Sequence, residues 1–280
     1  MLVARVRQAT RVRDAHGSST LRPMLLIASS TSFRGRLEAG ELSLEDLPRH
    51  IHEEHAIRGM ALTADLLAGA DMARLDALRE AADKAVCPIL LLQESEPQNF
   101  SSIDTVDAAV ERVSRVLHAA QRLGCSAVGI EVCPVADEDE MERLVDGLKE
   151  VSPVAEKLDL NLLVHVGVDP VKTPDDASEL IKRVGGFRVG TLPDFQLACA
   201  QGDGAEHLKR VAPYASVVIA STVKFQKNGK HPSYDLAELV AALQEIGFDG
   251  ALALEHRGDD DPDEAIRRAA ETIEQALEKV

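Results

Sequence analysis

Several features that mark particular classes of protein are missing from this chain of 280 residues. It has no stretch of about 18 consecutive apolar residues, which predicts that no segment spans a membrane. The four cysteines are scattered and form no Cys-x-x-Cys pair, as expected for reduced core residues of a cytoplasmic protein. Basic residues are scarce, at 31 against 47 acidic residues, and the net charge is −16. This charge disfavours nucleic acids as partners and suits a soluble protein that binds small molecules.

The first 22 residues differ from the rest of the chain. They contain five arginines and one acidic residue, Asp14. No apolar segment follows the arginines, so they do not form a typical secretory signal. We therefore divide the chain into a basic N-terminal extension, residues 1–22, and a single domain, residues 23–280. Two interpretations of the extension stay open: a flexible tail, or an arm that docks on the acidic body or on a second subunit of a homo-oligomer.

From residue 24 onward, short apolar runs alternate with amphipathic segments. The runs predicted to be strands are 24–29, 59–63, 88–93, 127–132, 161–166, 188–192, 216–221 and 251–255. Apolar residues spaced three and four apart predict helices at 106–123, 141–158, 175–184, 236–246 and 262–280. This alternation predicts an α/β fold, a (β/α)8 TIM barrel. An open doubly wound sheet is the alternative, but it requires a glycine-rich phosphate loop that residues 29–33 do not provide.

Two carboxylates stand at the ends of late strands. Asp194 follows the apolar run 188–192, and Glu255 ends the run 251–255. The carboxyl ends of the strands are where a β/α barrel carries out its chemistry. These two residues are therefore the strongest candidates for a functional site.

Three segments in the C-terminal half have a characteristic order and spacing. They are VGTLPDF at 189–195, LKRVAPYA at 208–215, and the segment 234–255, which ends in GFDGALALE. Through them, the chain resembles the sugar phosphate isomerase/epimerase family, the xylose-isomerase-like TIM barrels. The resemblance extends over residues 24–280 and implies carbohydrate metabolism, with a sugar or keto-sugar as the small-molecule substrate.

The resemblance also implies a divalent cation, held by Glu, Asp, His and Glu from strands five to eight. Such a cation polarises an oxygen of the sugar, while the glutamates move protons between adjacent carbons. Asp194 and Glu255 match two ligand positions, His165 stands where the family has the first Glu, and Ile219 stands where it has its His. The expected metal ligands are therefore His165, Asp194 and Glu255, binding Mn²⁺, Zn²⁺, Co²⁺ or Mg²⁺, with Glu255 or His165 as the catalytic proton carrier.

Further departures from the family pattern keep a second interpretation open. Gln196 and Leu197 replace the usual Gly-Asn, and Ser221 stands where a Lys is common. One function is therefore a metal-assisted isomerase, epimerase or related lyase. The alternative is a non-catalytic barrel that has lost its metal site, because Ile219 replaces a ligand, and that binds a sugar or a protein partner. A DNA-repair nuclease of the same barrel type would need more metal ligands and a basic groove.

Other polar residues near the strand ends are candidates for binding substrate: Glu131, His256, Arg257 and Lys224. The planar fork of Arg257 suits a phosphate or carboxylate group, although pairing with Asp259 or Asp260 is an alternative. For Glu131, and also for Glu94, the alternative is a salt-bridged carboxylate on the rim.

Two further clusters of polar residues are expected to be structural. His50, His52 and His55 are interleaved with Glu53 and Glu54, a pattern expected on a solvated face of a first helix that starts after Ser43. The acidic run 259–263 lacks the spaced acceptors and the closing Glu of a calcium loop. It is expected to cap the last helix instead.

Overall fold

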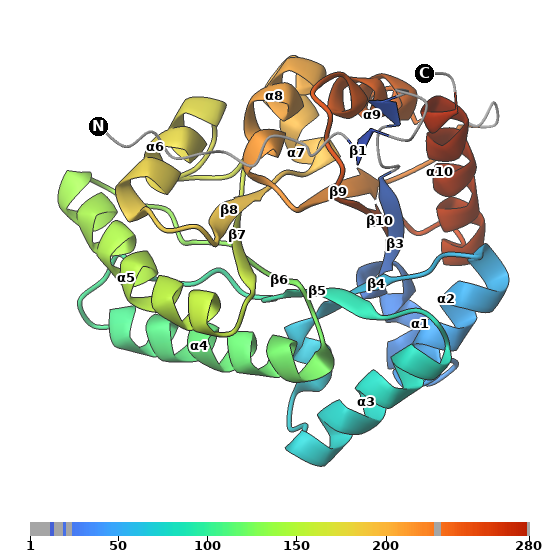
Figure 1. Cartoon of the computed structure of the whole chain (residues 1–280), viewed down its shortest axis with the longest axis horizontal. Helices are drawn as coiled ribbons and strands as arrows, with labels where there is room; N and C mark the ends of the chain where they lie inside the picture. The colour runs from blue at the N-terminus through green and yellow to red at the C-terminus, as the bar shows by residue number, and fades with distance from the viewer. Residues whose placement is uncertain (1–11, 14–18, 21–23, 227–230, 279–280) are drawn as a thin grey trace.

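A computed structural model describes residues 12–13, 19–20, 24–226 and 231–278. Eight parallel strands curl into a barrel whose surrounding helices form an outer layer (Figure 1). The strands are β3 (Leu25–Ser29), β4 (Met60–Thr63), β5 (Ile89–Gln93), β6 (Ala127–Ile130), β7 (Asn161–His165), β8 (Val189–Leu192), β9 (Val217–Thr222) and β10 (Ala251–His256). The predicted TIM-barrel fold is confirmed, and each strand lies within its predicted segment or within one residue of it.

Parallel pairing runs in the order β8-β7-β6-β5-β4-β3-β10-β9. A single bridge between Asp194 and Ile219 joins the two end strands, and the Ile219 amide donates to the Pro193 carbonyl at 2.8 Å. Closure of the barrel therefore depends on the residues next to the predicted site.

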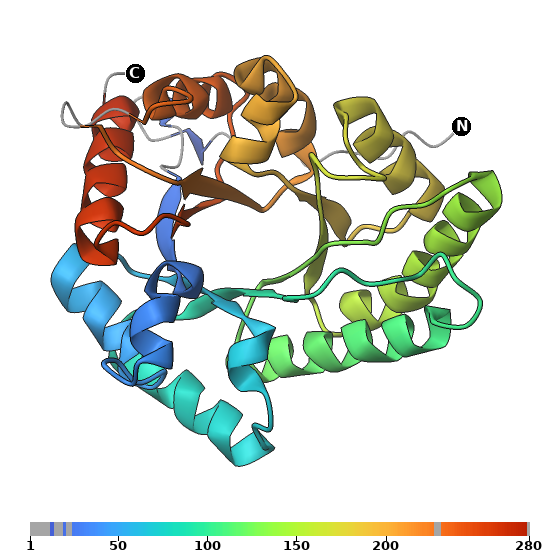
Figure 2. The ribbon, with the colours of Figure 1, turned by 180° about the vertical axis from the view of Figure 1, so that it is seen from behind.

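The helices cover the outside of the barrel, as the view from behind also shows (Figure 2). They are α1 (Arg34–Glu38), α2 (Leu47–His55), α3 (Met72–Lys84), α4 (Val106–Leu123), α5 (Glu138–Lys157), α6 (Pro174–Val184), α7 (Phe195–Ala200), α8 (Gly204–Val211), α9 (Leu236–Glu245) and α10 (Pro262–Leu277). In the described part of the chain, no helix is long and apolar enough to cross a membrane.

Helix starts follow the local capping chemistry. Thr173 and Asp176 form the reciprocal contacts of a capping box, with Pro174 in the first turn of α6. Ser43 and Asp46 also bond each other, but they close a turn, and α2 begins only at Leu47. The expected helix start at Ser43 is therefore wrong by one turn. As expected, the acidic run before α10 caps that helix, because Asp261 accepts from the Glu264 amide at 2.9 Å.

Most of the N-terminal extension, residues 1–22, lies outside the described residues. The described parts are β1 (Val12–Arg13) and β2 (Ser19–Thr20), which pair antiparallel.

The core has two layers. An inner cluster fills the barrel with a side chain from every strand: Ile27, Ala61, Leu91, Ala127, Leu163, Leu192, Val217, Ile219, Ala251 and Ala253. The second, larger cluster lies between the strands and the helices. Ile219 belongs to the inner cluster and is fully buried, so an apolar side chain fills the position where the resemblance implies a His ligand.

Close packing at Gly190 gives a test of this barrel. A Cβ atom on Gly190 would overlap the backbone carbonyl oxygen of Tyr214. Backbone cannot swing aside, so we expect Gly190→Ala to destabilise the fold by about 2 kcal/mol or more in urea unfolding. Gly35→Ala is the matched control, since no atom lies within 4 Å of its added Cβ in α1. Equal stability of the two variants would contradict this packing.

Candidate functional site

Asp194 is fixed where β8 gives way to α7. Its carboxylate caps α7, accepting from the Leu197 amide at 3.0 Å through Oδ1. The same oxygen accepts from the Ser221 hydroxyl of β9 at 2.8 Å. The Asp194 side chain is almost completely buried. Its second oxygen, Oδ2, takes no part in these two contacts and remains available at the barrel mouth.

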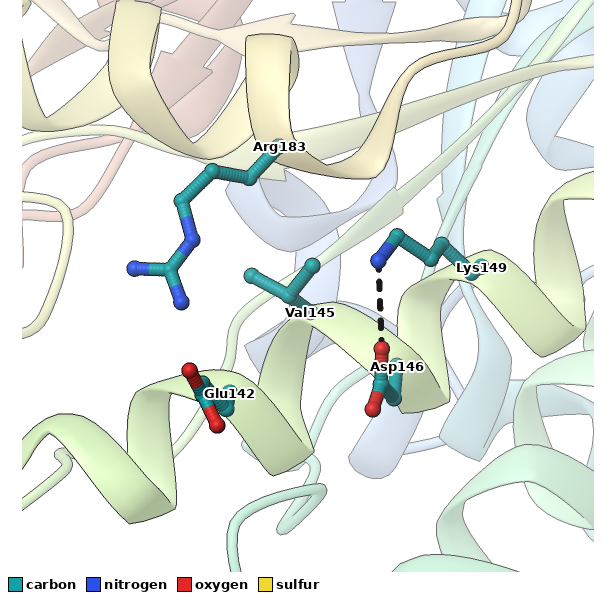
Figure 3. Close-up of a pocket in the computed structure, with 5 residues that line it drawn as sticks. All are labelled: Glu142, Val145, Asp146, Lys149 and Arg183. Atoms are coloured by element: carbon teal, nitrogen blue, oxygen red, sulfur yellow. Dashed lines mark hydrogen bonds and ion pairs between the residues drawn. The ribbon is translucent and has the colours of Figure 1, made fainter.

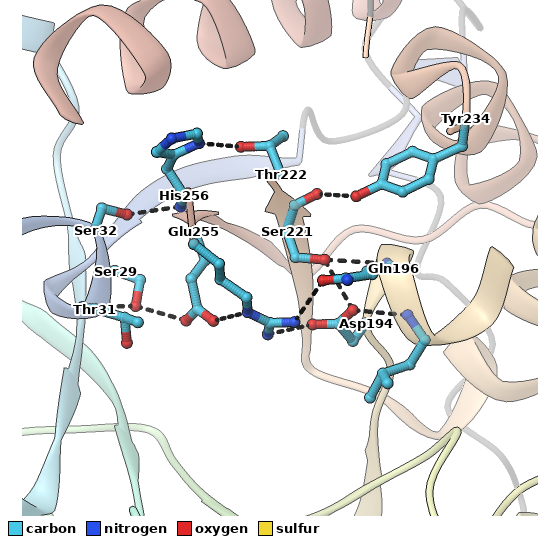
Figure 4. Close-up of polar contacts among 12 residues, drawn as sticks. Ser29, Thr31, Ser32, Asp194, Gln196, Ser221, Thr222, Tyr234, Glu255 and His256 are labelled. Atoms are coloured by element: carbon cyan, nitrogen blue, oxygen red, sulfur yellow. Dashed lines mark hydrogen bonds and ion pairs between the residues drawn. The ribbon is translucent and has the colours of Figure 1, made fainter. Parts of the chain in front are cut away.

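Glu255 lies at the end of β10, separated from Asp194 by β9. It is the penultimate residue of β10, and its Oε2 accepts from the Ser29 hydroxyl at 2.8 Å (Figure 4). Ser29 ends β3, the neighbour of β10 in the sheet. The two carboxylates therefore come from separate parts of the barrel, and each accepts from a serine: Asp194 from Ser221, which the sequence singled out as a departure from the family pattern, and Glu255 from Ser29, which it did not.

Arg257 joins the two carboxylates. Its Nε donates to Glu255 Oε1 at 2.7 Å, and its Nη2 donates to Asp194 Oδ2 at 2.6 Å. A third nitrogen, Nη1, contacts Gln196 Oε1 at 3.3 Å. Burial alone would lower the pKa of Arg257, but the two carboxylates outweigh it and raise that pKa. The guanidinium is therefore a permanent positive charge at the mouth, and it is 30% exposed.

A polar cavity of about 240 Å³ opens beside this ion pair. It is lined by Thr31, Arg34, Thr63, Gln93, Glu94, Ser95, Glu131, His165 and Glu255. Glu255 thus belongs both to the ion pair and to the cavity wall. Of the other predicted site residues, His165 and Glu131 reach the same cavity.

His165 ends β7 and is half-buried. Burial lowers its pKa, against the raising effects of Asp194, Glu131 and Glu255. Its ring is therefore neutral near pH 7 and can accept a proton.

The other predicted substrate-binding residues lie elsewhere. The His256 ring is buried and pairs with the Thr222 hydroxyl at 3.1 Å, since neighbouring residues of a strand point to opposite faces. Lys224 is exposed. Neither residue lines the cavity. Glu94 does line it, but its carboxylate forms two hydrogen bonds to Arg112, at 2.6 and 3.1 Å.

The geometry can be compared with the needs of a divalent cation at the mouth. A cation shared by Asp194 and Glu255 would have to bind oxygens that the Arg257 guanidinium already holds. Ile219 supplies no donor atom. Among the described residues, the ligand atoms of His165, Asp194 and Glu255 do not all lie within 4.8 Å of one another. In this arrangement the Arg257 guanidinium takes up the carboxylate oxygens that a divalent ion at the mouth would need, and the metal site of His165, Asp194 and Glu255 stays a prediction.

A larger depression, of about 390 Å³, lies on the outer helices (Figure 3). Four of the five residues around it are charged: Glu142, Asp146 and Lys149 from α5, and Arg183 from α6. It is an open cleft between helices on the outside of the barrel, away from the strand ends.

The histidines of α2 contradict the expectation of a solvated face. His55 is almost completely buried, and the rings of His50 and His55 both point at Asp263 of α10. His52 instead contacts the Ile57 carbonyl at 3.4 Å. Helical periodicity could not reveal this arrangement, because the partner lies more than 200 residues away.

Sequence comparison agrees with the observed architecture. The profile of the xylose isomerase-like TIM barrel family matches residues 52–276. The chain belongs to this family. Among curated proteins, none matches the chain.

Solved structures share the fold at low sequence identity. D-psicose 3-epimerase with D-tagatose from Clostridium cellulolyticum H10 has a TM-score of 0.75 and 15% identity, covering 91% of this chain and 99% of its own. An L-ribulose 3-epimerase has a TM-score of 0.75 and 16% identity, covering 91% and 95%. The IOLI protein with a binding zinc atom has a TM-score of 0.73 and 20% identity, covering 91% and 99%. These similarities establish the fold.

Proposed function

We propose that the protein is a sugar isomerase or epimerase that acts on a free sugar or keto-sugar at the mouth of the barrel. The observation that carries this proposal is the Arg257 guanidinium, fixed between two carboxylates beside a polar cavity. At about 240 Å³, the cavity is smaller than the ~300–1,000 Å³ of sites for drug-sized ligands, so it suits a single sugar. Membership of the family and the named epimerases among the similar structures support the same substrate class.

Isomerisation of a keto-sugar requires removal of a proton from a carbon next to a carbonyl group. We propose that Glu255 and His165 carry this proton, because both line the cavity and His165 is neutral. Removal of the proton leaves negative charge on the carbonyl oxygen, which a fixed positive group stabilises. Two cations are near this oxygen: Arg34, which lines the cavity, and Arg257, which lies beside it. We assign the task to Arg257, because Asp194 and Glu255 hold it in a fixed position where the family pattern implies a metal.

The ion pair also favours the second candidate, a barrel that binds a sugar without converting it. Both oxygens of Glu255 already accept hydrogen bonds, one from Ser29 and one from Arg257. A carboxylate held in this way has fewer free positions from which to accept a proton from a sugar. Under this alternative, the cavity recognises sugar hydroxyls and no proton is transferred.

Exchange of hydrogen with solvent separates the two candidates. D-psicose, D-tagatose and D-fructose would be incubated with the protein in D₂O, and deuterium incorporation next to the carbonyl followed by NMR. We expect Glu255→Gln to slow the exchange by ~100-fold or more, the usual contribution of a general base. Glu131→Gln, on the same cavity wall, is expected to weaken sugar binding while exchange continues.

Each outcome has a clear meaning. Sugar binding without exchange in the wild-type protein would establish the binding-only function. Neither binding nor exchange with any of the sugars would overturn the proposed function.

A further inference from the structure

We propose that His50, His55 and Asp263 form a binding site for a transition-metal ion of the Zn²⁺ type, separate from the barrel mouth. All three side chains are of types that bind metal ions. In the described part of the chain, one potential ligand atom from each lies within 4.8 Å of the other two. Imidazole nitrogen and carboxylate oxygen are both normal zinc ligands. The proposal does not depend on the sugar chemistry.

The three ligand atoms already converge. His50 Nε2 lies 2.7 Å from Asp263 Oδ1, and His55 Nε2 lies 2.9 Å from the same oxygen. Zinc bonds of about 2.0–2.1 Å in tetrahedral geometry place neighbouring ligand atoms about 3.3 Å apart. An ion therefore needs an outward shift of about half an ångström by the ligands.

Without an ion, protons on the imidazoles satisfy the hydrogen bonds of the cluster. His50 Nε2 donates to Asp263 Oδ1, while Arg36 Nη1, 3.2 Å from the same ring nitrogen, donates to Asp263 Oδ2. A metal ion bound to His50 Nε2 and Asp263 Oδ1 replaces their contact, and His50 Nε2 gives up its proton.

Neighbouring groups hold the ligands in position. Arg36 donates to the other carboxylate oxygen, Oδ2, at 2.7 Å, which turns Oδ1 toward the two imidazoles. Phe33 packs against both rings, with centroid distances of 5.6 Å to His50 and 6.2 Å to His55. The far nitrogen of His55, Nδ1, is buried and has no partner among the described residues. Bound through Nε2, His55 would carry its proton on Nδ1 without an acceptor, which weakens the affinity of the site.

The site is also accessible and has room for an additional ligand. The side chain of His55 is 1% exposed, but those of His50 and Asp263 are 17% and 23% exposed. Solvent can therefore reach the ligands and supply a fourth ligand to the ion. The nearby Arg36 charge opposes a cation, so we expect micromolar affinity, weaker than that of a four-ligand structural site.

Calorimetric titration of the metal-free full chain with Zn²⁺ tests the proposal, with Co²⁺ absorption as a second readout of the ligand field. We expect one ion per chain. His55→Ala and Asp263→Asn should each weaken binding by ~10–100-fold. His52→Ala is the matched control, because His52 lies on the same helix but contacts the Ile57 carbonyl, and its affinity should equal that of the wild type.

Two results would overturn the proposal: no Zn²⁺ uptake by the wild-type protein, or uptake that His55→Ala and Asp263→Asn leave unchanged. His50→Ala is the second variant if His55→Ala fails to fold, since His50 is the more exposed of the two histidines. Failure here would leave sugar exchange at the barrel mouth unaffected, so the two proposals fail separately.

Discussion

Replacing Arg257 with alanine is expected to lower the free energy of unfolding by about 3 kcal/mol at pH 7. The change leaves the buried carboxylates of Asp194 and Glu255 without their shared cation. The value is at the low end for a broken buried ion pair, because the guanidinium is 30% exposed. Urea unfolding of both proteins measures the difference.

An exposed ion pair gives the comparison for this variant. Arg115→Ala is the matched control, because its partner Glu111 is exposed on the same helix, and it should change stability by less than about 0.5 kcal/mol. A deficit no larger than that of Arg115→Ala would show that the ion pair is not important for stability.

Removing Arg257 and restoring the missing ligand should together create a metal site. We expect the double variant Arg257→Ala/Ile219→His to bind Mn²⁺ at least ~100-fold more tightly than the wild type, or ~2.7 kcal/mol in binding free energy. Ile219 is the residue paired with Asp194 across the closing bridge, so an imidazole there starts beside one carboxylate. Mn²⁺ is chosen because carboxylate oxygens suit it well.

The single variants separate the two causes. With Arg257 in place, Ile219→His should gain little affinity, because the guanidinium still competes for the carboxylate oxygens. If Ile219→His alone binds Mn²⁺ as tightly as the double variant, Arg257 is not the group that excludes the ion.

The sequence predicted the frame of the site better than its contacts. The alternating apolar runs predicted the eight strands, because periodicity along the backbone determines where strands form. The positions of Asp194 and Glu255 at strand ends identified them as site residues, because barrel topology brings the strand ends together. The conformation of Arg257 was harder to predict. The sequence offered nearby Asp259 and Asp260 as partners, whereas the guanidinium reaches back to the strand ends.

Two departures from the family pattern, Gln196 and Ser221, lie at the ion pair, and only the structure shows why they are there. Gln196 contacts Arg257, and Ser221 donates to Asp194, so both unusual residues brace the ion pair. The position of His50 and His55 against Asp263 is not indicated by any such departure. These contacts between α2 and α10 depend on how the barrel closes, and the local sequence patterns of the two helices do not indicate it.

The metal dependence of hydrogen exchange tests most directly whether Arg257 supplies the positive charge at the mouth. Exchange between keto-sugars and D₂O would be measured with the metal-free protein in excess EDTA, and again after addition of Mn²⁺ or Zn²⁺. We expect wild-type exchange to continue at an unchanged rate in EDTA, and Arg257→Gln to slow it by ~100-fold or more, the effect of losing one stabilising donor. Exchange that stops in EDTA and returns with added metal, while Arg257→Gln retains wild-type activity, would contradict this role of Arg257.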